Sequence, residues 1–220
     1  MARVKFDLSL IPPCPDLSSE QTLWQEGFKR VAGIDEAGRG ALAGPVAVGA
    51  VILPPNLPEL ALKLDGVRDS KQLSPAERET RAVKIKEVAL CWAVGTADAA
   101  EIDRVGIAKA TRLAALRAIT QLSSAPQHLL IDYIRLPESP LPQSSLVKGD
   151  QRSLSIACAS ILAKTTRDAL MTGYDALFTG YGFARHKGYG TAGHLAQILE
   201  RGACAIHRHS FAPFHLPDHP

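Results

Sequence analysis

The chain has 220 residues, of which 46% are hydrophobic, and a formal net charge of +3. This length suits one large domain, and the small positive charge permits a polyanionic partner without requiring one. No run of about 18 uncharged apolar residues occurs, so no membrane span is predicted, and no signal peptide is recognisable at the start. The four cysteines are far apart in sequence, which predicts reduced thiols in a cytoplasmic protein, with Cys91 and Cys158 buried and no zinc site.

The N-terminal segment, residues 1–28, is predicted to be peripheral because it begins with a proline-rich stretch. A short helix near its end is expected to be capped by Ser18 or Ser19. Two apolar runs follow, at residues 29–36 and 44–53, and the second is bounded by Gly-Pro and Pro-Pro. These runs predict the first two strands.

The middle of the chain predicts a helix, a strand and a second helical region. Ser74, Pro75 and Glu77 have the pattern of an N-cap, a first-turn proline and the acid of a capping box. Residues 91–97 form an apolar run that predicts a third strand. The helical stretch that follows is expected to bend or split at Gly106.

The remaining part predicts two strands, at residues 128–134 and 145–149, and two helices. The first helix, residues 153–178, is long and rich in small residues, and its middle is expected to be buried. A short helix at residues 191–202 follows glycine-rich loops. Because hairpin-like strands come first and βαβ units later, we expect an α/β fold with a mixed sheet and helices packed on it.

Four carboxylates lie at or near the predicted strand ends. Asp35 and Glu36 close the first strand, Asp132 lies inside the apolar run LLIDYI, and Asp150 follows the last strand. Taken singly, Asp150 could cap the long helix, and Asp35 and Glu36 could be solvated turn residues. Asp132 is harder to explain structurally, because a buried aspartate is costly without a compensating partner.

Strand ends of one sheet can bring these carboxylates together, where they would repel one another unless cations bind. Hard divalent cations such as Mg²⁺ or Mn²⁺ prefer oxygen ligands, and a pair about 3.5–4 Å apart stabilises the attacking and leaving oxygens of an in-line phosphoryl displacement. Consecutive strand residues face opposite ways, so Asp35 and Glu36 can share a site only if the backbone turns between them. With a regular backbone, Glu36 would contribute through its main-chain carbonyl instead.

A glycine-arginine-glycine stretch, Gly38, Arg39 and Gly40, comes directly after the first two carboxylates. Glycine allows a tight turn and lets main-chain groups approach a ligand closely, and arginine pairs well with phosphate. A plain tight turn without a ligand is the alternative interpretation.

The stretch GIDEAGRGALAGPV, residues 33–46, is similar to the signature of the type 2 ribonucleases H, in particular the bacterial ribonuclease HII family. The resemblance continues in family order along most of the chain. It includes residues 69–75, 146–168, 186–194 and 207–213.

The resemblance implies an RNase H-like mixed β-sheet flanked by helices, with a small helical C-terminal portion. This catalytic domain would comprise residues 29–213, and residues 214–220 would form a tail. The implied activity is endonucleolytic cleavage of RNA in RNA–DNA hybrids and incision at single ribonucleotides in duplex DNA, which leaves 5′-phosphate and 3′-hydroxyl ends. A cytoplasmic monomer that serves ribonucleotide excision repair is expected.

By the same resemblance, the residues that match the catalytic and metal-binding carboxylates of the family are Asp35, Glu36, Asp132 and Asp150. The turn of Gly38, Arg39 and Gly40 matches the element that reads the 2′-hydroxyl at the RNA–DNA junction, which is the group that distinguishes RNA from DNA.

Tyr189 matches the tyrosine that packs against the deoxyribose beside the cut, and its glycine-flanked loop is unsuited to core packing. Lys148, Lys164 and Arg167 are expected to contact substrate phosphates. Two further basic residues, Lys187 and Arg208, also fall in the matching segments, and Arg185 directly precedes one of them.

Two further expectations concern single residues. Asp168 is expected to pair locally with a base rather than to take part in catalysis. The family often has Asp-Gly where this chain has Asp132-Tyr133, so Tyr133 either narrows that edge of the site or faces the other side of the strand.

Other functional classes fit the sequence less well. A P-loop is disfavoured because Arg39-Gly40 stands where Lys-Ser/Thr is needed, and no dinucleotide-binding glycine motif is present. Zinc binding by the histidines near the C-terminus, at 207, 209, 215 and 219, is less favoured than surface positions for them. A nucleic-acid-binding module without catalysis would be expected if Asp35, Glu36 or Asp132 were missing, but all three are present. An RNase A-type mechanism, in which the 2′-hydroxyl is the nucleophile, would need paired catalytic histidines.

Overall fold

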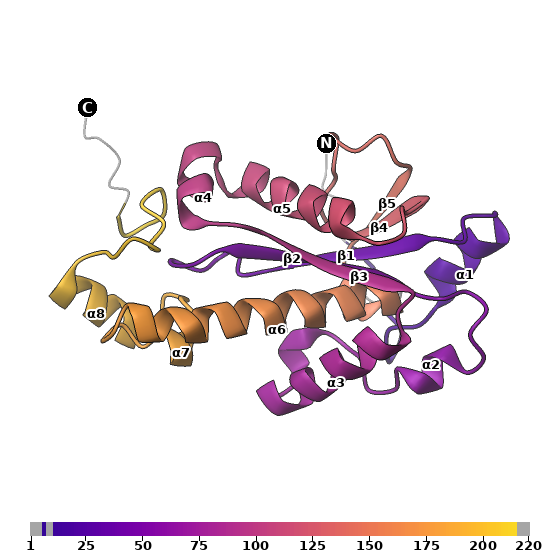
Figure 1. Ribbon diagram of the computed structural model, residues 1–220, viewed down its shortest axis with the longest axis horizontal. Coiled ribbons are helices and arrows are strands. Elements are labelled where there is room, and N and C mark those ends of the chain that lie inside the picture. The colour runs from indigo at the N-terminus through magenta and orange to yellow at the C-terminus, as the bar shows by residue number, and fades with distance from the viewer. Residues whose placement is uncertain (1–5, 8–10, 215–220) are drawn as a thin grey trace.

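The computed structural model describes residues 6–7 and 11–214, and five strands in this range form one mixed sheet in the order β3-β2-β1-β4-β5 (Figure 1). The strands are β1 (Val31–Ala37), β2 (Val46–Ile52), β3 (Cys91–Ala97), β4 (His128–Asp132) and β5 (Gln143–Leu146). The helices are α1 (Ser18–Gln25), α2 (Leu60–Lys63), α3 (Pro75–Val88), α4 (Ala99–Val105), α5 (Ile107–Gln121), α6 (Leu154–Leu177), α7 (Phe183–His186) and α8 (Ala192–Arg201), with 3-10 turns η2 (Ser70–Gln72) and η3 (Gly149–Gln151). None of the helices in the described ranges is long and apolar enough to cross a membrane.

The sheet has an antiparallel half and a parallel half. Strand β2 pairs antiparallel with both β1 and β3, whereas β4 pairs parallel with both β1 and β5. In the β1–β4 pair, Ile34 lies opposite Ile131. The next residues along these two parallel strands, Asp35 and Asp132, therefore reach the same edge of the sheet.

Helices cover both faces of the sheet (Figure 1). Helix α6 packs on β1 and β2 from one side, α5 packs on β2 and β3 from the other, and α3 lies outside α6. Alternation along β1 supplies both cores, because Val31 joins the α6 side and Ala32 joins the α5 side. Helix α6 can approach the sheet closely because Gly49 has no side chain, and a Cβ atom there would overlap the carbonyl group of Ala159.

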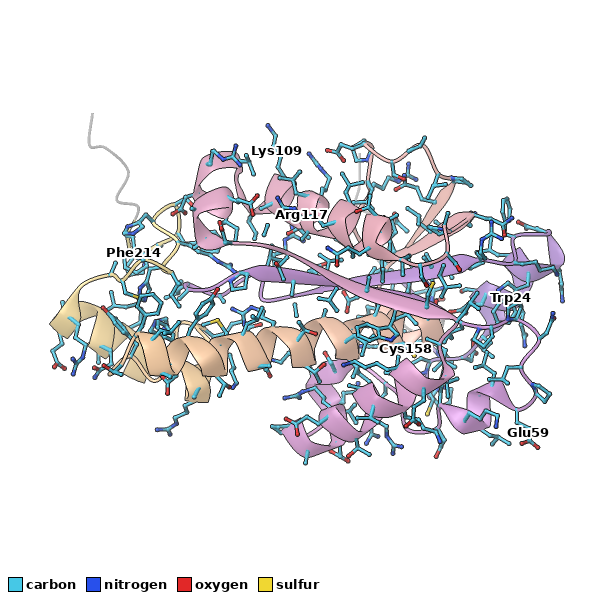
Figure 2. The ribbon with its side chains drawn as sticks, in the orientation of Figure 1. Trp24, Glu59, Lys109, Arg117, Cys158 and Phe214 are labelled. Atoms are coloured by element: carbon cyan, nitrogen blue, oxygen red, sulfur yellow. The ribbon has the colours of Figure 1, made fainter. Side chains whose placement is uncertain are left out.

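The first half of α6 is almost entirely inside the molecule, whereas the small-residue composition predicted burial of its middle. Every residue from Leu154 to Ala163 is buried. Figure 2 shows Cys158 on this part of α6, while Lys109 on α5 points away from the sheet. Cys91 and Cys158 are buried free thiols, which confirms the sequence expectation.

The N-terminal helix contributes to this core although it lies at one end of the sheet (Figure 1). Its Leu23 and Trp24 side chains are buried in the cluster that α6 shares with β1. Glu20 is fully buried, and its Oε1 atom accepts hydrogen bonds from Ser153 Oγ at 2.6 Å and from the Ser155 amide at 2.8 Å. This carboxylate therefore attaches α1 to the start of α6.

Several local predictions are confirmed. Strand β3 has the expected bounds, and Ser74 and Glu77 form the capping box at the start of α3. The helical region after β3 splits at Gly106 into α4 and α5.

Three local predictions are wrong. Strand β4 ends at Asp132 because Tyr133 adopts a left-handed conformation with φ of 59°, and β5 is Gln143–Leu146 rather than residues 145–149. Lys148, with φ of 54°, precedes a 3-10 turn there. Neither Ser18 nor Ser19 caps α1, because Ser18 already belongs to the helix and donates from its amide to Asp16 Oδ1.

Candidate active site

Three of the four predicted carboxylates converge at one edge of the sheet. Oxygen atoms of Asp35, Asp132 and Asp150 all lie within 4.8 Å of one another. The parallel pairing of β1 with β4 places the first two side by side, and η3 brings Asp150 to them after β5. The Gly149 amide donates to Asp132 Oδ1 at 2.7 Å, which fixes the turn against the strand end.

Glu36 is not part of this three-carboxylate group. Strand β1 stays regular through Ala37, so the Glu36 side chain leaves the strand on the face opposite Asp35. Its carboxylate lies 3.6 Å from Arg39 NH1. The turn between Asp35 and Glu36 that a shared site for both side chains requires is absent from this conformation.

The alternative in which Asp150 caps the long helix is not observed. Helix α6 has Ser153 as its N-cap, and the Ser153 hydroxyl accepts from the Ile156 amide. Asp150 instead lies buried in η3, and its Oδ2 atom is 3.7 Å from Lys71 Nζ.

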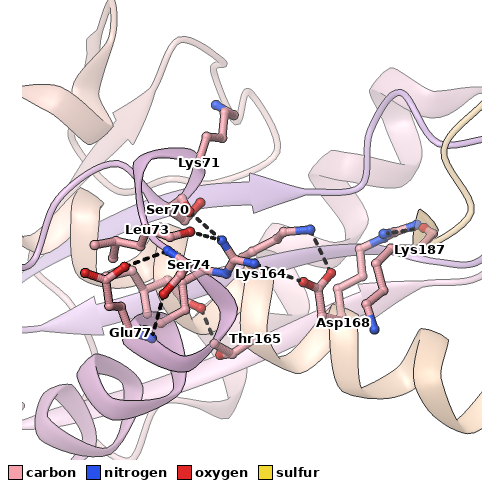
Figure 3. Close-up of polar contacts among 12 residues, drawn as sticks. Ser70, Lys71, Leu73, Ser74, Glu77, Lys164, Thr165, Asp168 and Lys187 are labelled. Atoms are coloured by element: carbon pink, nitrogen blue, oxygen red, sulfur yellow. Dashed lines mark hydrogen bonds and ion pairs between the residues drawn. The ribbon is translucent and has the colours of Figure 1, made fainter. Parts of the chain in front are cut away.

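A fifth acid, Asp69, lies beside the cluster and was not identified as a site residue from the sequence. It is buried, lies 3.9 Å from Lys71 Nζ and accepts from Gln151 Nε2 at 3.4 Å. Asp69 belongs to the DSKQLSP stretch that resembles the family, so its position in that motif was the signal available in the sequence. Figure 3 shows Lys71 extending from this segment, away from the capping box of Ser74 and Glu77.

Burial and mutual repulsion make the cluster unfavourable without cations. Desolvation and the nearby charges of Glu36 and Asp132 raise the pKa of Asp35 well above its usual value. Desolvation raises the pKa of Asp132 as well, and desolvation with the adjacent Asp69 raises that of Asp150 to about 6. Lys71 is the nearest compensating charge, but its side chain is 79% exposed.

These features fit a hard divalent cation. Three buried carboxylates supply the oxygen ligands that such ions prefer, and their raised pKa values show that negative charge is insufficiently compensated by the protein itself. Among residues 6–7 and 11–214, this is the one group of acidic, histidine or cysteine side chains with metal-binding geometry. Neither His207 nor His209 is part of such a group. His209 is exposed, but His207 is buried, so a surface position was wrong for His207. The histidines at 215 and 219 lie outside the described residues.

The glycine-arginine-glycine turn follows Ala37 and is held from inside by two buried arginines. Gly38 has φ of 86°, which glycine adopts readily, and a Cβ atom there would collide with the Arg167 guanidinium. Arg208 donates to the carbonyl oxygens of Gly38 at 2.8 Å and Arg39 at 2.9 Å. The carbonyl groups of Gly38 and Arg39 therefore point toward the interior.

Arg167, which was predicted to contact a substrate phosphate, lies inside the protein instead. Its side chain is fully buried and donates to the carbonyl oxygens of Pro45, Ala43 and Lys187 at 2.8, 3.0 and 2.9 Å. A guanidinium enclosed in this way cannot reach a phosphate in this conformation. The burial of Arg167 was not predictable from the sequence, because spacing along a helix does not show which face a loop covers.

Tyr189 lies in the loop that these hydrogen bonds connect to the turn. The amide of Leu42 donates to the Gly188 carbonyl at 2.8 Å, so the two loops are also joined through the main chain. The Tyr189 ring centroid is 5.4 Å from the Arg167 guanidinium carbon and 5.6 Å from Lys164 Nζ. The ring is partly exposed, as a residue that contacts a ligand must be.

A cationic cavity of about 760 Å³ extends from Tyr189 between α3, α6 and α7. Lys164, Arg185 and Lys187 line it. Lys164 pairs with Asp168 at 2.7 Å, which confirms the local ion pair expected for that acid (Figure 3).

Two predicted features stay at the margins of the site. Lys148 is exposed, two residues before Asp150, and is accessible to a ligand. Tyr133 is 70% exposed beyond the end of β4, so it does not pack into the sheet.

Comparison with known proteins assigns the chain to a family. A model of the family "Ribonuclease HII" matches residues 32–214. A ribonuclease HII of Dehalococcoides mccartyi is 50% identical over 91% of this chain and 94% of its own length, and one of Thermus thermophilus is 54% identical over 88% and 91%. The crystal structure of ribonuclease H2 from Pyrococcus horikoshii has the same fold, with a TM-score of 0.70 at 24% identity over 84% of this chain and 95% of that one. The chain therefore belongs to the ribonuclease HII family, whose members are divalent-metal-dependent endoribonucleases that act on RNA–DNA hybrids.

Proposed function

We propose that the protein incises duplex DNA at single embedded ribonucleotides, in addition to cutting the RNA strand of hybrids, and that it uses two divalent cations, Mg²⁺ or Mn²⁺. The observation that carries this proposal is the convergence of Asp35, Asp132 and Asp150 within 4.8 Å beside the glycine-arginine-glycine turn. We further propose that it acts as a cytoplasmic monomer in ribonucleotide excision repair.

In this proposal Asp35, Asp132 and Asp150 hold the cations, and Glu36 contributes through its main-chain carbonyl or after its side chain leaves Arg39. Cations bound there would neutralise the attacking and leaving oxygens of an in-line displacement by water. The carboxylates fix the position of this positive charge relative to the scissile phosphate. The products would carry 5′-phosphate and 3′-hydroxyl ends.

Recognition of the junction would come from two elements that the buried arginines hold together. The turn of Gly38, Arg39 and Gly40 would read the ribose 2′-hydroxyl, and the Tyr189 ring would pack on the deoxyribose on the other side of the cut. Lys148 and Lys164 would contact phosphates, and Arg167 would act indirectly by holding both loops.

An RNase A-type mechanism is less consistent with the structure. His194 and His207 do lie together, but both side chains are fully buried and hydrogen-bonded to each other. Neither can take a proton from a ribose hydroxyl of a bound duplex without leaving its position.

The proposal is tested with an end-labelled DNA duplex that contains one ribonucleotide, compared with the same duplex made only of DNA. In the first duplex we expect one cut, at the phosphodiester on the 5′ side of the ribonucleotide, which leaves 3′-hydroxyl and 5′-phosphate ends. We expect no cut in the second duplex. A cyclic phosphate product, or cleavage only of continuous RNA strands, would refute it.

A further inference from the structure

Two buried histidines form a direct contact behind the Tyr189 loop. The Nε2 atoms of His194 and His207 lie 3.1 Å apart, and both side chains are at most 1% exposed. We propose that His194 and His207 form a neutral hydrogen-bond chain of fixed direction that positions Tyr189, so that both are positioning residues for junction recognition. The functional part of this inference rests on the role proposed above for Tyr189.

The direction of the chain follows from its two ends, because each end is a main-chain group with only one possible role. The Cys204 amide can only donate, and it lies 2.8 Å from His207 Nδ1, so this nitrogen accepts and the proton is on Nε2. The Tyr189 carbonyl can only accept, and it lies 3.0 Å from His194 Nδ1, so this nitrogen carries the proton. His207 Nε2–H therefore donates to the bare Nε2 atom of His194.

The neighbouring carbonyl does not support the opposite direction. His207 Nδ1 is 3.3 Å from the Cys204 carbonyl oxygen, which is longer than its 2.8 Å contact with the Cys204 amide. That carbonyl already accepts from the His207 amide at 2.9 Å. The two imidazoles thus need opposite tautomers, Nδ1–H in His194 and Nε2–H in His207.

A third histidine holds the other side of the same loop. His186 Nδ1 accepts from the Gly188 amide at 3.1 Å, and its Nε2 atom donates to the Tyr181 carbonyl at 2.7 Å. Its ring stacks on His194 with centroids 4.2 Å apart and planes 18° apart. Gly188 is consequently attached to His186, and Tyr189 to His194, so one pair of stacked histidines holds this loop.

The chain tolerates no additional proton. A second proton on His194 Nε2 would set two N–H groups against each other across the 3.1 Å contact. A second proton on His207 Nδ1 would face the Cys204 amide N–H, 2.8 Å away. Burial, with the neighbouring His194, His209 and His186, lowers the pKa of His207 to about 4, and burial also lowers the pKa of His194. The other titratable groups beside the pair, Tyr181 and Cys204, have pKa values raised by burial and supply no negative charge at neutral pH.

Amide side chains can replace one half of the His194 ring at a time. In His194→Asn, the amide nitrogen can occupy the place of Nδ1 and donate to the Tyr189 carbonyl, while the link to His207 is lost. In His194→Gln, the longer amide can accept from His207 Nε2–H, while the link to Tyr189 is lost. The two variants are matched in polarity and charge. An asparagine amide can donate to the Tyr189 carbonyl without His207 to fix a tautomer, so the variants differ in whether the contact with Tyr189 is kept.

The first test is nitrogen-15 NMR of the histidine rings in the full-length protein at pH 7. We expect a neutral Nδ1–H tautomer for His194 and a neutral Nε2–H tautomer for His207. The same tautomer in both rings, or a charged ring, would overturn the hydrogen-bond chain, whatever substrate the protein cuts.

The second test compares kcat/KM on a duplex with one ribonucleotide and on a continuous RNA–DNA hybrid. We expect His194→Gln to lower the ratio by about tenfold or more, since a displacement of about 1 Å can cost on the order of a hundredfold in rate, and His194→Asn to keep most of the wild-type ratio. Equal ratios in both variants would overturn the positioning role. If the wild-type protein cut only the hybrid, the proposed junction function would fail, and the NMR result would still decide the hydrogen-bond chain.

Discussion

The guanidinium of Arg167 donates to the carbonyl oxygen of Lys187 at 2.9 Å, and this bond links α6 to the loop that carries Tyr189. The same guanidinium donates to Ala43 and Pro45, in the segment that follows the glycine-arginine-glycine turn. A buried positive charge is tolerated here because main-chain carbonyls accept its hydrogen bonds. The segment that follows the turn and the Tyr189 loop are therefore held in a fixed relation by one side chain.

Replacement of Arg208 by lysine should loosen the turn. Lysine cannot donate simultaneously to the Gly38, Arg39 and Gly44 carbonyls in the geometry that the guanidinium provides. We expect Arg208→Lys to lower the free energy of unfolding by about 2–4 kcal/mol, since each unsatisfied buried acceptor costs about 1–3 kcal/mol. Denaturant unfolding measures this, with the exposed Arg201→Lys as a control that should change little. A loss of stability no larger than that of the control would contradict the claim that Arg208 holds the turn through these hydrogen bonds.

Replacement of Tyr189 by alanine should impair incision at an isolated ribonucleotide more than cleavage within a continuous RNA strand. A ring packed on a sugar favours the flat face of deoxyribose, and a 2′-hydroxyl there would crowd it. Loss of the ring removes a positioning contact, and misplacement by about 1 Å can cost on the order of a hundredfold in rate. The measurement is kcat/KM on both substrates, with Tyr189→Phe as the variant that keeps the ring. Equal losses on both substrates would mean that Tyr189 does not sense the junction.

Asp35→Asn and Asp132→Asn should each nearly abolish turnover while duplex binding remains, because the basic residues of the site are unchanged. Either variant that kept more than about a tenth of the wild-type rate, a barrier change of about 1.4 kcal/mol, would exclude that residue from the metal site.

The Asp35→Asn variant should also be more stable than the wild type when cations are absent. The pKa of Asp35 is higher in the folded state than in the unfolded state. The folded state therefore loses stability as pH rises and this carboxyl group ionises, and its charge is unfavourable at pH 7. The variant should have a higher melting temperature in thermal unfolding with chelator. The expected gain in the free energy of unfolding is about 1–3 kcal/mol.

Glu20 should make stability depend on pH in a way that glutamine removes. Burial raises the pKa of Glu20 above its usual value of 4.5, so its contribution is complete below that pH and declines as pH rises and the carboxylate must ionise. We expect Glu20→Gln to gain stability relative to the wild type as pH increases from about 4.5 to 8. If the difference in the free energy of unfolding between the two proteins stayed constant over this pH range, the pKa of Glu20 would not be raised in the folded state.

Much of the fold was predictable because local signals agreed with tertiary packing. The capping box at Ser74 and Glu77 and the break at Gly106 depend on nearby residues alone, and both are confirmed. The end of β4 was not predictable in this way. Tyr133 belongs to an apolar run that favours a strand, but it adopts a left-handed conformation where the chain leaves the sheet.

The candidate site was predictable only in part for a similar reason. Strand ends indicated the region where Asp35, Asp132 and Asp150 meet, because parallel strands align their ends. Glu36 faces away from the cluster and pairs with Arg39, three residues further along the chain. The position of Asp69 beside Asp150 depends on a contact between segments that are distant in sequence. Burial of Arg167 likewise depends on which loops cover α6.

The most direct test of the central claim is a calorimetric titration of Mn²⁺ into the full-length protein, paired with the cleavage assay in the same buffer. The claim is that Asp35, Asp132 and Asp150 form one cation site that cleavage requires. We expect Mn²⁺ to bind the wild type and the control Glu200→Gln, which changes an exposed acid far from the cluster in sequence, and to restore cleavage after chelator treatment. We expect Asp132→Asn to lose both. Unchanged Mn²⁺ binding by Asp132→Asn, or equal cleavage in excess chelator, would contradict the account.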